Sequence, residues 1–303
     1  MRIVRYATTG GLTRLGVVEG GNVLSLPAGT TLDSLLRSRD VRPVSTQRLD
    51  ELSDQLLSPV GFPPSIRDFM SFEDHVVTSM SALGRSVDPV WYEQPVFYFS
   101  NPAAVIGPND DVRIAPGSAA FDFELEIVAV IGDPGSDIPV EDAEAHIAAY
   151  ALMSDWSARD LQEQEMKVGL GPAKGKDTAT TIGPYLVTPD ELEPYRQGGG
   201  FDVALSVDVN GQHYSQGNWS TIYWSFAQMI AYASRGTTLR SGDVIGSGTV
   251  GTGCILELGR VHGFDKFPYL QPRDIVTVDG GPLGSFTQTV VSRRDAVLAH
   301  IET

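Results

Sequence analysis

The sequence predicts an α+β protein in which strands outnumber helices. Beyond residue 95, most segments are short and strand-like, and proline and glycine residues separate them at 102, 107–108 and 116–117. The few segments with helical spacing do not alternate regularly with strands, as a doubly wound parallel sheet would require. Prolines at 59, 63 and 64 mark a domain boundary, so we expect a small N-terminal domain over residues 1–63 and a larger domain over residues 64–303.

The N-terminal residues are expected to form a small β-rich unit. Residues 1–26 have the pattern of short strands separated by glycine-rich turns, with a hairpin tip at residues 20–22. Residues 30–60 carry leucines at helical spacing and end in the prolines of the boundary.

Three segments of the larger domain are expected to be helical. Apolar residues recur at helical spacing over residues 65–83, over residues 140–153 and around residues 225–234. Residues 201–211 alternate apolar and polar side chains and end in Asn210–Gly211, which predicts a strand closed by a tight turn. Strands are expected to complete the chain.

Composition excludes several classes of protein. The 303 residues include 38 acidic and 22 basic ones, a net charge of −16, whereas binding to a phosphate backbone needs clustered lysine and arginine. The single cysteine, Cys254, rules out an intrachain disulfide, and the sequence shows neither a secretory signal nor an apolar run near the roughly 20 residues that a membrane-spanning helix needs. We therefore expect a cytoplasmic protein that binds neither nucleic acid nor a membrane.

Three carboxylates alternate along one strand-like segment, residues 121–132. Period-2 alternation places Asp122, Glu124 and Glu126 on one face, which continues into the apolar residues Val128 and Val130. Buried carboxylates are costly unless a cation or protons neutralise them. A hard divalent metal bound by oxygen ligands satisfies this requirement and points to an enzyme.

Two further groups of polar residues have spacings that suit a metal-bound anion. If the chain is helical after Asp155, then Arg159 and Gln162 share its face at i+4 and i+7; a surface Asp–Arg pair is the alternative. Asp68 and His75 are seven residues apart in the expected helix, about 10 Å along its axis. Histidine is the side chain best suited to take a proton from water near neutral pH, and the other four histidines are expected to be structural or exposed.

Two glycine-rich segments do not fit nucleotide-binding loops. Residues 169–184 contain Lys174 and Lys176 but lack the spacing of a phosphate-binding loop. Residues 246–251 match G-x-G-x-x-G, yet the strand-like residues 254–258 follow where a dinucleotide fold needs a helix. These glycines are expected instead to let backbone amides around Thr249 approach a ligand.

Taken together, these motifs resemble those of the fumarylacetoacetate hydrolase family. The likeness covers roughly residues 64–295. The motifs that carry it are a His seven residues after an Asp, E-x-E on a strand, D-W-S-A-R-D-x-Q, the following L-G-P-x-x-x-K, and S-G-T before a late glutamate. The resemblance implies a mixed β-roll or β-sandwich catalytic domain after a small N-terminal domain, usually assembled as a homodimer.

The resemblance also assigns roles to individual residues. It implies that a divalent metal, most often Mg²⁺ with Ca²⁺ or Mn²⁺ as alternatives, binds Asp68, Glu124, Glu126 and Asp155. It makes His75 the base and Glu257 the acid that orients this base, and Glu257 is expected on a strand. Many bacterial relatives carry the acid three residues after the histidine, a position that Thr78 occupies here. The substrate and its developing charge are held by Arg159, Gln162 and Lys176, with Tyr98, Thr180, Thr249 and Arg85 as further substrate contacts.

The family implies hydrolysis of a carbon–carbon bond in a β-diketone or acylpyruvate. In this mechanism His75 activates water, and Lys176 with Gln162 stabilises the tetrahedral intermediate. Two other reactions of an enolate at the same site stay open: decarboxylation of a 2-oxo acid and keto–enol isomerisation. A protein that binds metal without catalysis is the third alternative. The acyl group and the pathway are left open.

Overall fold

The computed structural model describes residues 1–38, 42–82 and 84–292. His300 and the C-terminal end of the predicted larger domain lie outside the described residues. No helix in the described part of the chain has the length and apolar character needed to cross a membrane.

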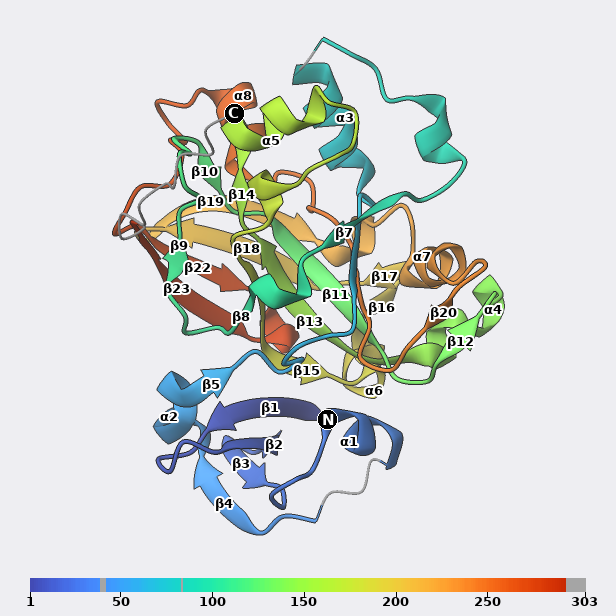
Figure 1. Ribbon diagram of the computed structural model, residues 1–303, viewed down its shortest axis with the longest axis vertical. Helices are drawn as coiled ribbons and strands as arrows, with labels where there is room; N and C mark the ends of the chain where they lie inside the picture. Colours follow the sequence, from blue (N-terminus) through green and yellow to red (C-terminus); the bar gives the residue numbers. More distant parts are fainter. Residues whose placement is uncertain (39–41, 83, 293–303) are drawn as a thin grey trace, which may run out of the picture.

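A large mixed sheet runs through the molecule (Figure 1). In the described residues it has twelve strands; ten follow the order β4-β3-β2-β1-β15-β13-β11-β21-β6-β7, while β5 pairs with β1 and β8 pairs with β15. Their bounds are β1 Arg2–Ala7, β2 Thr13–Glu19, β3 Asn22–Ser25, β4 Ser45–Arg48, β5 Leu56–Leu57, β6 Ile66–Phe69, β7 Phe97–Ser100, β8 Val105–Ile106, β11 Leu125–Ile131, β13 Ile147–Asp155, β15 Thr180–Val187 and β21 Val244–Gly246.

A second sheet packs against the first, so the larger part of the chain is a two-layered β structure. Its strand order is β19-β18-β22-β23-β9, with bounds β9 Val112–Arg113, β18 Ala204–Val209, β19 Gln212–Asn218, β22 Ile275–Asp279 and β23 Ser285–Val291. Three short pairs complete the strands: β10 Phe121–Asp122 with β14 Ser157–Ala158, β12 Gly135–Ser136 with β20 Thr238–Leu239, and β16 Arg196–Gln197 with β17 Gly200–Phe201.

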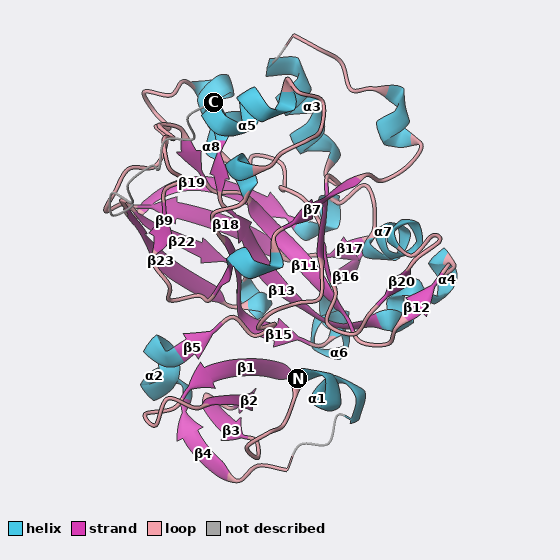
Figure 2. Cartoon of the chain, viewed as in Figure 1, coloured by secondary structure: helices cyan, strands magenta, loops and turns pink. Residues whose placement is uncertain are grey.

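Helices lie around these sheets rather than between them (Figure 2). Their bounds are α1 Leu32–Ser38, α2 Leu49–Leu52, α3 Glu73–Ala82, α4 Val140–Ala143, α5 Arg159–Met166, α6 Pro189–Leu192, α7 Phe226–Ala233 and α8 Ile255–His262. Helix α7 begins with a capping box between Ser225 and Gln228, so the expected helix near 225–234 is confirmed. The α+β, strand-rich fold class is confirmed as well.

Strand β11 separates the two parts of the hydrophobic core. Its odd-numbered side chains, such as Ile127 and Ala129, pack with side chains of the five-stranded sheet. Its even-numbered Val128 and Val130 pack with Ile3, Leu35 and other residues of the N-terminal region. The face that carries Glu126 therefore continues into a buried apolar core, as period-2 alternation predicts.

The N-terminal strands are continuous with the large sheet. The hairpin β2–β3 turns at residues 20–21, and β1 pairs with β15 through Arg2 and Ile3. Figure 1 shows these strands at the bottom of the molecule, next to β15. The two regions thus share one sheet and part of one core, and the division at residue 63 stays a prediction.

Three predicted secondary structures are wrong. Residues 140–153 are not one helix, since α4 and a short 3₁₀ turn that includes His146 give way to the fully buried strand β13. Asp68 lies in strand β6, whereas the helix with His75 begins at Glu73. Residues after Cys254 form helix α8, so Glu257 is on a helix and not on a strand.

The glycine-rich loop before α8 therefore does precede a helix. However, the strand that comes next, β22, belongs to the five-stranded sheet, while β21 lies between antiparallel β11 and parallel β6. A dinucleotide site needs a β–α–β unit within one parallel sheet. The nucleotide interpretation is still excluded, for this reason rather than for the predicted strand.

Candidate active site

The carboxylates predicted to bind a metal converge at one end of adjacent strands. Asp68 lies in β6, Glu126 in β11 and Asp155 at the end of β13, and Glu124 directly precedes β11. One carboxylate oxygen from each of Asp68, Glu126 and Asp155 lies within 4.8 Å of the others. All four side chains are buried. Residues distant in sequence thus form one acidic cluster, the carboxylate cluster.

A glycine allows Asp68 to enter this cluster. Gly246 of β21 is the register partner of Asp68 in the parallel pair β21–β6. A Cβ atom at Gly246 would lie 2.3 Å from Asp68 Oδ1, so any other residue would displace the carboxylate. The backbone N–H of Gly248 then donates to the same oxygen at 3.2 Å.

Two buried cations neutralise one side of the cluster. Lys176 Nζ donates to Asp155 Oδ2 at 2.8 Å and to Glu124. Arg159 Nη2 forms an ion pair with Glu124 Oε1 at 2.7 Å. Burial alone would raise the pKa of Glu124, but Arg159 and Lys176 outweigh it and lower that pKa to about 2. Glu124 is therefore ionised.

The other side of the cluster holds uncompensated negative charge. Burial, followed by the neighbouring charge of Asp155, raises the pKa of Asp68 to about 7. Burial and the charges of Asp68 and Glu124 raise the pKa of Glu126 well above its ordinary value. Glu126 Oε2 is buried without a hydrogen-bond partner. Carboxylates crowded in this way favour protons or a cation in their midst.

The predicted base and its acid are in contact. His75 Nδ1 lies 2.8 Å from Glu257 Oε2, a pair formed between α3 and α8. Glu257 is 2% exposed and its other oxygen, Oε1, is buried without a partner. Because Nδ1 bonds to the carboxylate, Nε2 is the ring nitrogen available to take a proton. The structure thus brings His75 and Glu257 together, as the sequence predicts.

The predicted substrate contacts divide into those near the cluster and one outside it. Tyr98 donates to Asp155, Thr180 Oγ1 donates to Asp155 at 3.5 Å, and Thr249 Oγ1 donates to Glu126 at 3.3 Å. Gln162 Oε1 accepts from Arg159 Nη1 at 3.0 Å, which leaves its amide nitrogen as a donor. Arg85 is exposed beyond the end of α3, and within the described residues its side chain forms no hydrogen bond or ion pair with these groups.

Asp155, Arg159 and Gln162 do not share a helix face. Asp155 ends strand β13, and helix α5 begins only at Arg159. The alternative of a surface Asp–Arg pair is also wrong, because both side chains are buried and Arg159 pairs with Asp122 and Glu124 instead.

Sequence reasoning missed the role of Asp122. Its carboxylate accepts from the backbone N–H groups of Ile255 and Leu256, at 2.7 and 2.9 Å, and from Arg159 Nε at 2.8 Å. It therefore holds the first turn of α8, the helix that carries Glu257, in the way an N-terminal cap does. The alternation in residues 121–126 signalled a buried carboxylate, but only the fold shows what it binds.

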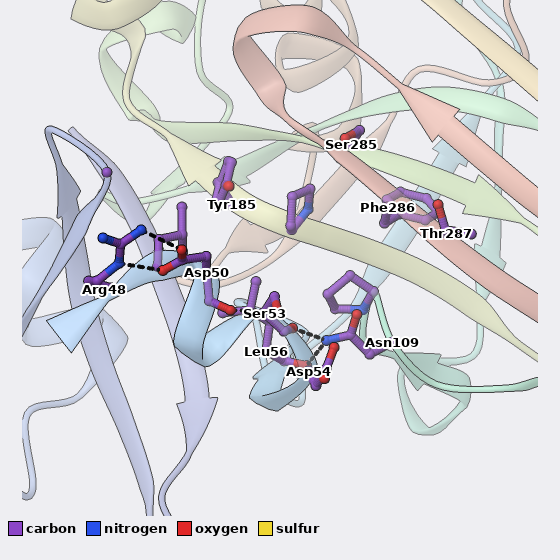
Figure 3. Close-up of a pocket in the computed structure, with 14 residues that line it drawn as sticks. Arg48, Asp50, Ser53, Asp54, Leu56, Asn109, Tyr185, Ser285, Phe286 and Thr287 are labelled. Carbon is purple, nitrogen blue, oxygen red and sulfur yellow. Dashed lines mark hydrogen bonds and ion pairs between the residues drawn. The ribbon is translucent and has the colours of Figure 1, made fainter.

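The cleft in Figure 3 is separate from these groups. Its volume is about 660 Å³, and it lies between N-terminal residues such as Arg48 and Asp50 and residues of the larger region such as Tyr185 and Phe286. None of the carboxylate-cluster residues lines it. The candidate active site is the carboxylate cluster with its adjoining histidine.

Comparison with known proteins identifies the family of the chain. The family model described as "Fumarylacetoacetate (FAA) hydrolase C-terminal" matches residues 65–291. Fumarylacetoacetase of Arabidopsis thaliana is 32% identical over 220 residues, which cover 57% of this chain and 52% of that protein. The chain thus spans about half the length of this curated relative.

Solved structures resemble the chain over nearly its whole length. The structure of fumarylacetoacetate hydrolase from psychrophilic Exiguobacterium antarcticum has a TM-score of 0.76 and 26% identity, and the match covers 97% of this chain and 100% of that one. That of 5-carboxymethyl-2-hydroxymuconate delta-isomerase from Mycobacterium smegmatis has a TM-score of 0.72 with the same coverage, but at 24% identity it shows the fold alone. From these matches and from the family model, the chain belongs to the fumarylacetoacetate hydrolase family.

Proposed function

We propose that the protein is a metal-dependent hydrolase that cleaves a carbon–carbon bond in a β-diketone or acylpyruvate. The observation that carries this proposal is the combination of the carboxylate cluster with the His75–Glu257 pair. A cluster that only bound metal for stability would not need a buried histidine oriented by a carboxylate. The pair supplies a base beside a site for an anionic substrate.

The residues of the cluster fit a hard divalent cation. Asp68, Glu126 and Asp155 would hold it, and the unpartnered Glu126 Oε2 offers it a buried oxygen donor. Glu124, whose oxygens pair with Arg159 and Lys176 in this structure, would be the fourth ligand. Mg²⁺ is the first choice, with Ca²⁺ and Mn²⁺ as alternatives, because all four donors are carboxylates. Bound there, the cation supplies Lewis-acid stabilisation of negative charge on the substrate's enolate oxygens.

His75 starts the proposed reaction. Its Nε2 takes a proton from water while Glu257, bonded to Nδ1, holds the ring and stabilises the imidazolium that forms. The hydroxide adds to the carbonyl carbon remote from the enolate, and the resulting oxyanion accepts hydrogen bonds from Lys176 Nζ and the Gln162 amide. The carbon–carbon bond then breaks and its electron pair leaves with the enolate fragment, which takes up the proton held on His75 Nε2. The other fragment forms as a carboxylic acid, loses its proton to solvent and leaves as a carboxylate.

Substrate contacts are proposed on the same basis. Tyr98, Thr180 and Thr249 lie against the carboxylates and would turn their hydroxyls to substrate oxygens once a cation neutralises those carboxylates. Arg159 would support the enolate through its link to Glu124. A second copy of the chain is the expected protein partner, to be tested by analytical ultracentrifugation.

Asp122→Asn is expected to lower kcat by about 10- to 100-fold while Mg²⁺ affinity stays within a factor of about three, by analogy with other residues that orient site groups. Asparagine offers one acceptor where two N–H groups and Arg159 now bind, so α8 would no longer hold Glu257 firmly against His75. The matched control is Asp243→Asn, which changes a buried carboxylate bonded to Ser65, to the backbone N–H of Arg240 and to the Arg67 guanidinium, none of them a proposed site group. Equal kcat values for the two variants would contradict this role.

Mg²⁺ affinity is expected to rise with pH. Burial raises the pKa of Asp68 from 3.8 to about 7, so the folded, metal-free protein binds this proton more tightly than the unfolded chain does. The cation must displace this proton, so Asp68 alone should make the affinity increase by about tenfold per pH unit below that pKa, and the raised pKa of Glu126 adds a second proton to displace. Isothermal titration calorimetry in buffers of different ionisation enthalpy measures the Mg²⁺ affinity and the number of protons released on binding. A flat profile of affinity from about pH 5.5 to about pH 8 would contradict the prediction.

The reaction itself is tested with a panel of acylpyruvates and β-diketones. Loss of enol absorbance is followed with Mg²⁺ present, and product masses are determined. Two fragments that together gain one water support the hydrolase. Carbon dioxide would indicate a decarboxylase, and unchanged mass an isomerase, each of which would overturn the hydrolase proposal while retaining the site.

A further inference from the structure

A second group of metal-binding side chains lies beside the carboxylate cluster. One ligand atom from each of His75, Cys254 and Glu257 lies within 4.8 Å of the others, and all three residues are buried. The Cys254 thiol donates to Glu257 Oε2 at 3.9 Å, and the same oxygen is 2.8 Å from His75 Nδ1. Cys254 is the N-cap residue of α8 and Glu257 is the third residue of its first turn, so both lie at the start of the helix.

The ligand types distinguish this group from the carboxylate cluster. Imidazole and thiolate are ligands that Zn²⁺ and other borderline-soft cations prefer, whereas Mg²⁺ and Ca²⁺ prefer oxygen alone. A separate observation also points to a ligand: Glu257 Oε1 is buried without a hydrogen-bond partner. Glu257 thus has an oxygen that the contact with His75 does not use.

The distances suit a small cation. Glu257 Oε2 lies 2.8 Å from His75 Nδ1 and 3.9 Å from Cys254 Sγ, separations that one cation with bonds of about 2.0 to 2.3 Å can bridge. We propose that His75, Cys254 and Glu257 form a binding site for Zn²⁺ that is distinct from the carboxylate cluster. A water molecule would be the fourth ligand.

Charge and protons balance at such a site. Zn²⁺ replaces the thiol proton of Cys254, which passes to solvent, and the imidazole proton moves from Nδ1 to Nε2. Cysteine thiolate and glutamate carboxylate each carry one negative charge, so the buried complex is neutral. His75 is 9% exposed and is the most accessible of the three.

Occupation of this site would inhibit the enzyme, an effect that rests on the proposed function. With Zn²⁺ on Nδ1, Nε2 of His75 carries a proton and cannot accept one from water. Glu257 would be committed to the same cation. Zinc would therefore switch off the base without displacing the metal of the carboxylate cluster.

Cobalt spectroscopy tests the site without any activity measurement. Protein saturated with Mg²⁺ is titrated with Co²⁺, and the near-ultraviolet band of thiolate-to-cobalt charge transfer is recorded. Because Cys254 is the only cysteine in the 303 residues, any such band is assigned to it. The wild-type protein is expected to bind one Co²⁺ with this band, Zn²⁺ is expected to remove it, and Cys254→Ser is expected to lack it.

Two further variants keep the test decisive. Glu257→Gln retains the thiol but loses the carboxylate. It should weaken Co²⁺ binding, measured from the growth of the charge-transfer band during the titration, at least tenfold. Asp74→Asn, one residue before His75 but outside the group, should leave it unchanged. Absence of the band from folded wild-type protein, or an undiminished band in Cys254→Ser, would overturn the proposal.

Inhibition is then measured at saturating Mg²⁺. Zn²⁺ should inhibit the wild type at concentrations at least tenfold below those that inhibit Cys254→Ser. Equal inhibition of both proteins would overturn the inhibitory role. If the wild type shows the cobalt band but no substrate is turned over, the zinc site stands and the proposed function fails.

Discussion

His75→Ala is expected to lower kcat by about 10²- to 10⁴-fold, the usual contribution of a general base, while Mg²⁺ binding is unchanged. His75 hydrogen-bonds to Glu257 and to none of the four proposed metal ligands, so its removal leaves the hydrogen bonds and ion pairs of the carboxylate cluster in place. Steady-state kinetics on the preferred acylpyruvate and calorimetric titration with Mg²⁺ measure the two effects separately.

The matched control for His75→Ala is His213→Ala. His213 is an exposed histidine whose Nδ1 likewise bonds to a carboxylate, that of Asp208, at 2.9 Å. The control should retain wild-type kcat. Near-wild-type hydrolysis by His75→Ala would show that another group takes the proton from water.

Glu126→Gln is expected to abolish both metal binding and turnover. The substitution keeps the shape of a side chain that is fully buried but removes one of the carboxylates proposed to hold the cation. Residues behind the metal ligands commonly contribute 10- to 100-fold to affinity, so loss of a ligand should weaken Mg²⁺ binding by more than about 100-fold.

The same substitution should stabilise the metal-free protein. Burial and like charges raise the pKa of Glu126 in the folded protein well above its ordinary value. Glu126 therefore ionises more easily in the unfolded chain, and at pH 8 this difference lowers the stability of the folded protein. A neutral glutamine at this position removes that opposition, and metal-free Glu126→Gln should have a higher Tm than the metal-free wild type. The order should reverse with saturating Mg²⁺, which stabilises only the protein that binds it. Retained Mg²⁺ affinity in this variant would contradict the ligand assignment.

Much of the fold could be predicted from local patterns. The β2–β3 hairpin, the turn at Asn210–Gly211 and helix α7 all depend on glycine, asparagine or capping residues near the elements that they start or end. Such signals act over a few residues, so the sequence alone carries them.

Strand β13 has a helix-like sequence pattern because it is buried on both faces. All nine of its residues are buried, so apolar and alanine residues occur without the alternation that marks a half-exposed strand. Its pairing with β11 and β15, distant in sequence, decides its conformation. The error at Asp68 has a related reason, since β6 owes its extended form to pairing with β21 and β7.

The candidate site was predictable where residue types are distinctive. Glu124 and Glu126 follow from alternation, and the other ligands and the base came from the family resemblance. Asp122 and Cys254 were not assigned roles, because their contacts join residue 122 to residues 255 and 256, and residue 254 to His75. No local pattern reports a contact between residues so far apart in the sequence.

One measurement tests the central claim most directly. The purified protein is incubated with an acylpyruvate in isotopically labelled water, with Mg²⁺ or with excess EDTA, and the products are analysed by mass spectrometry. We predict two fragments in the Mg²⁺ reaction, one of them a carboxylate that carries one labelled oxygen beyond substrate exchange, and no cleavage in EDTA until Mg²⁺ or Mn²⁺ is restored. Full cleavage in EDTA, or cleavage products without the label, would contradict metal-dependent hydrolysis.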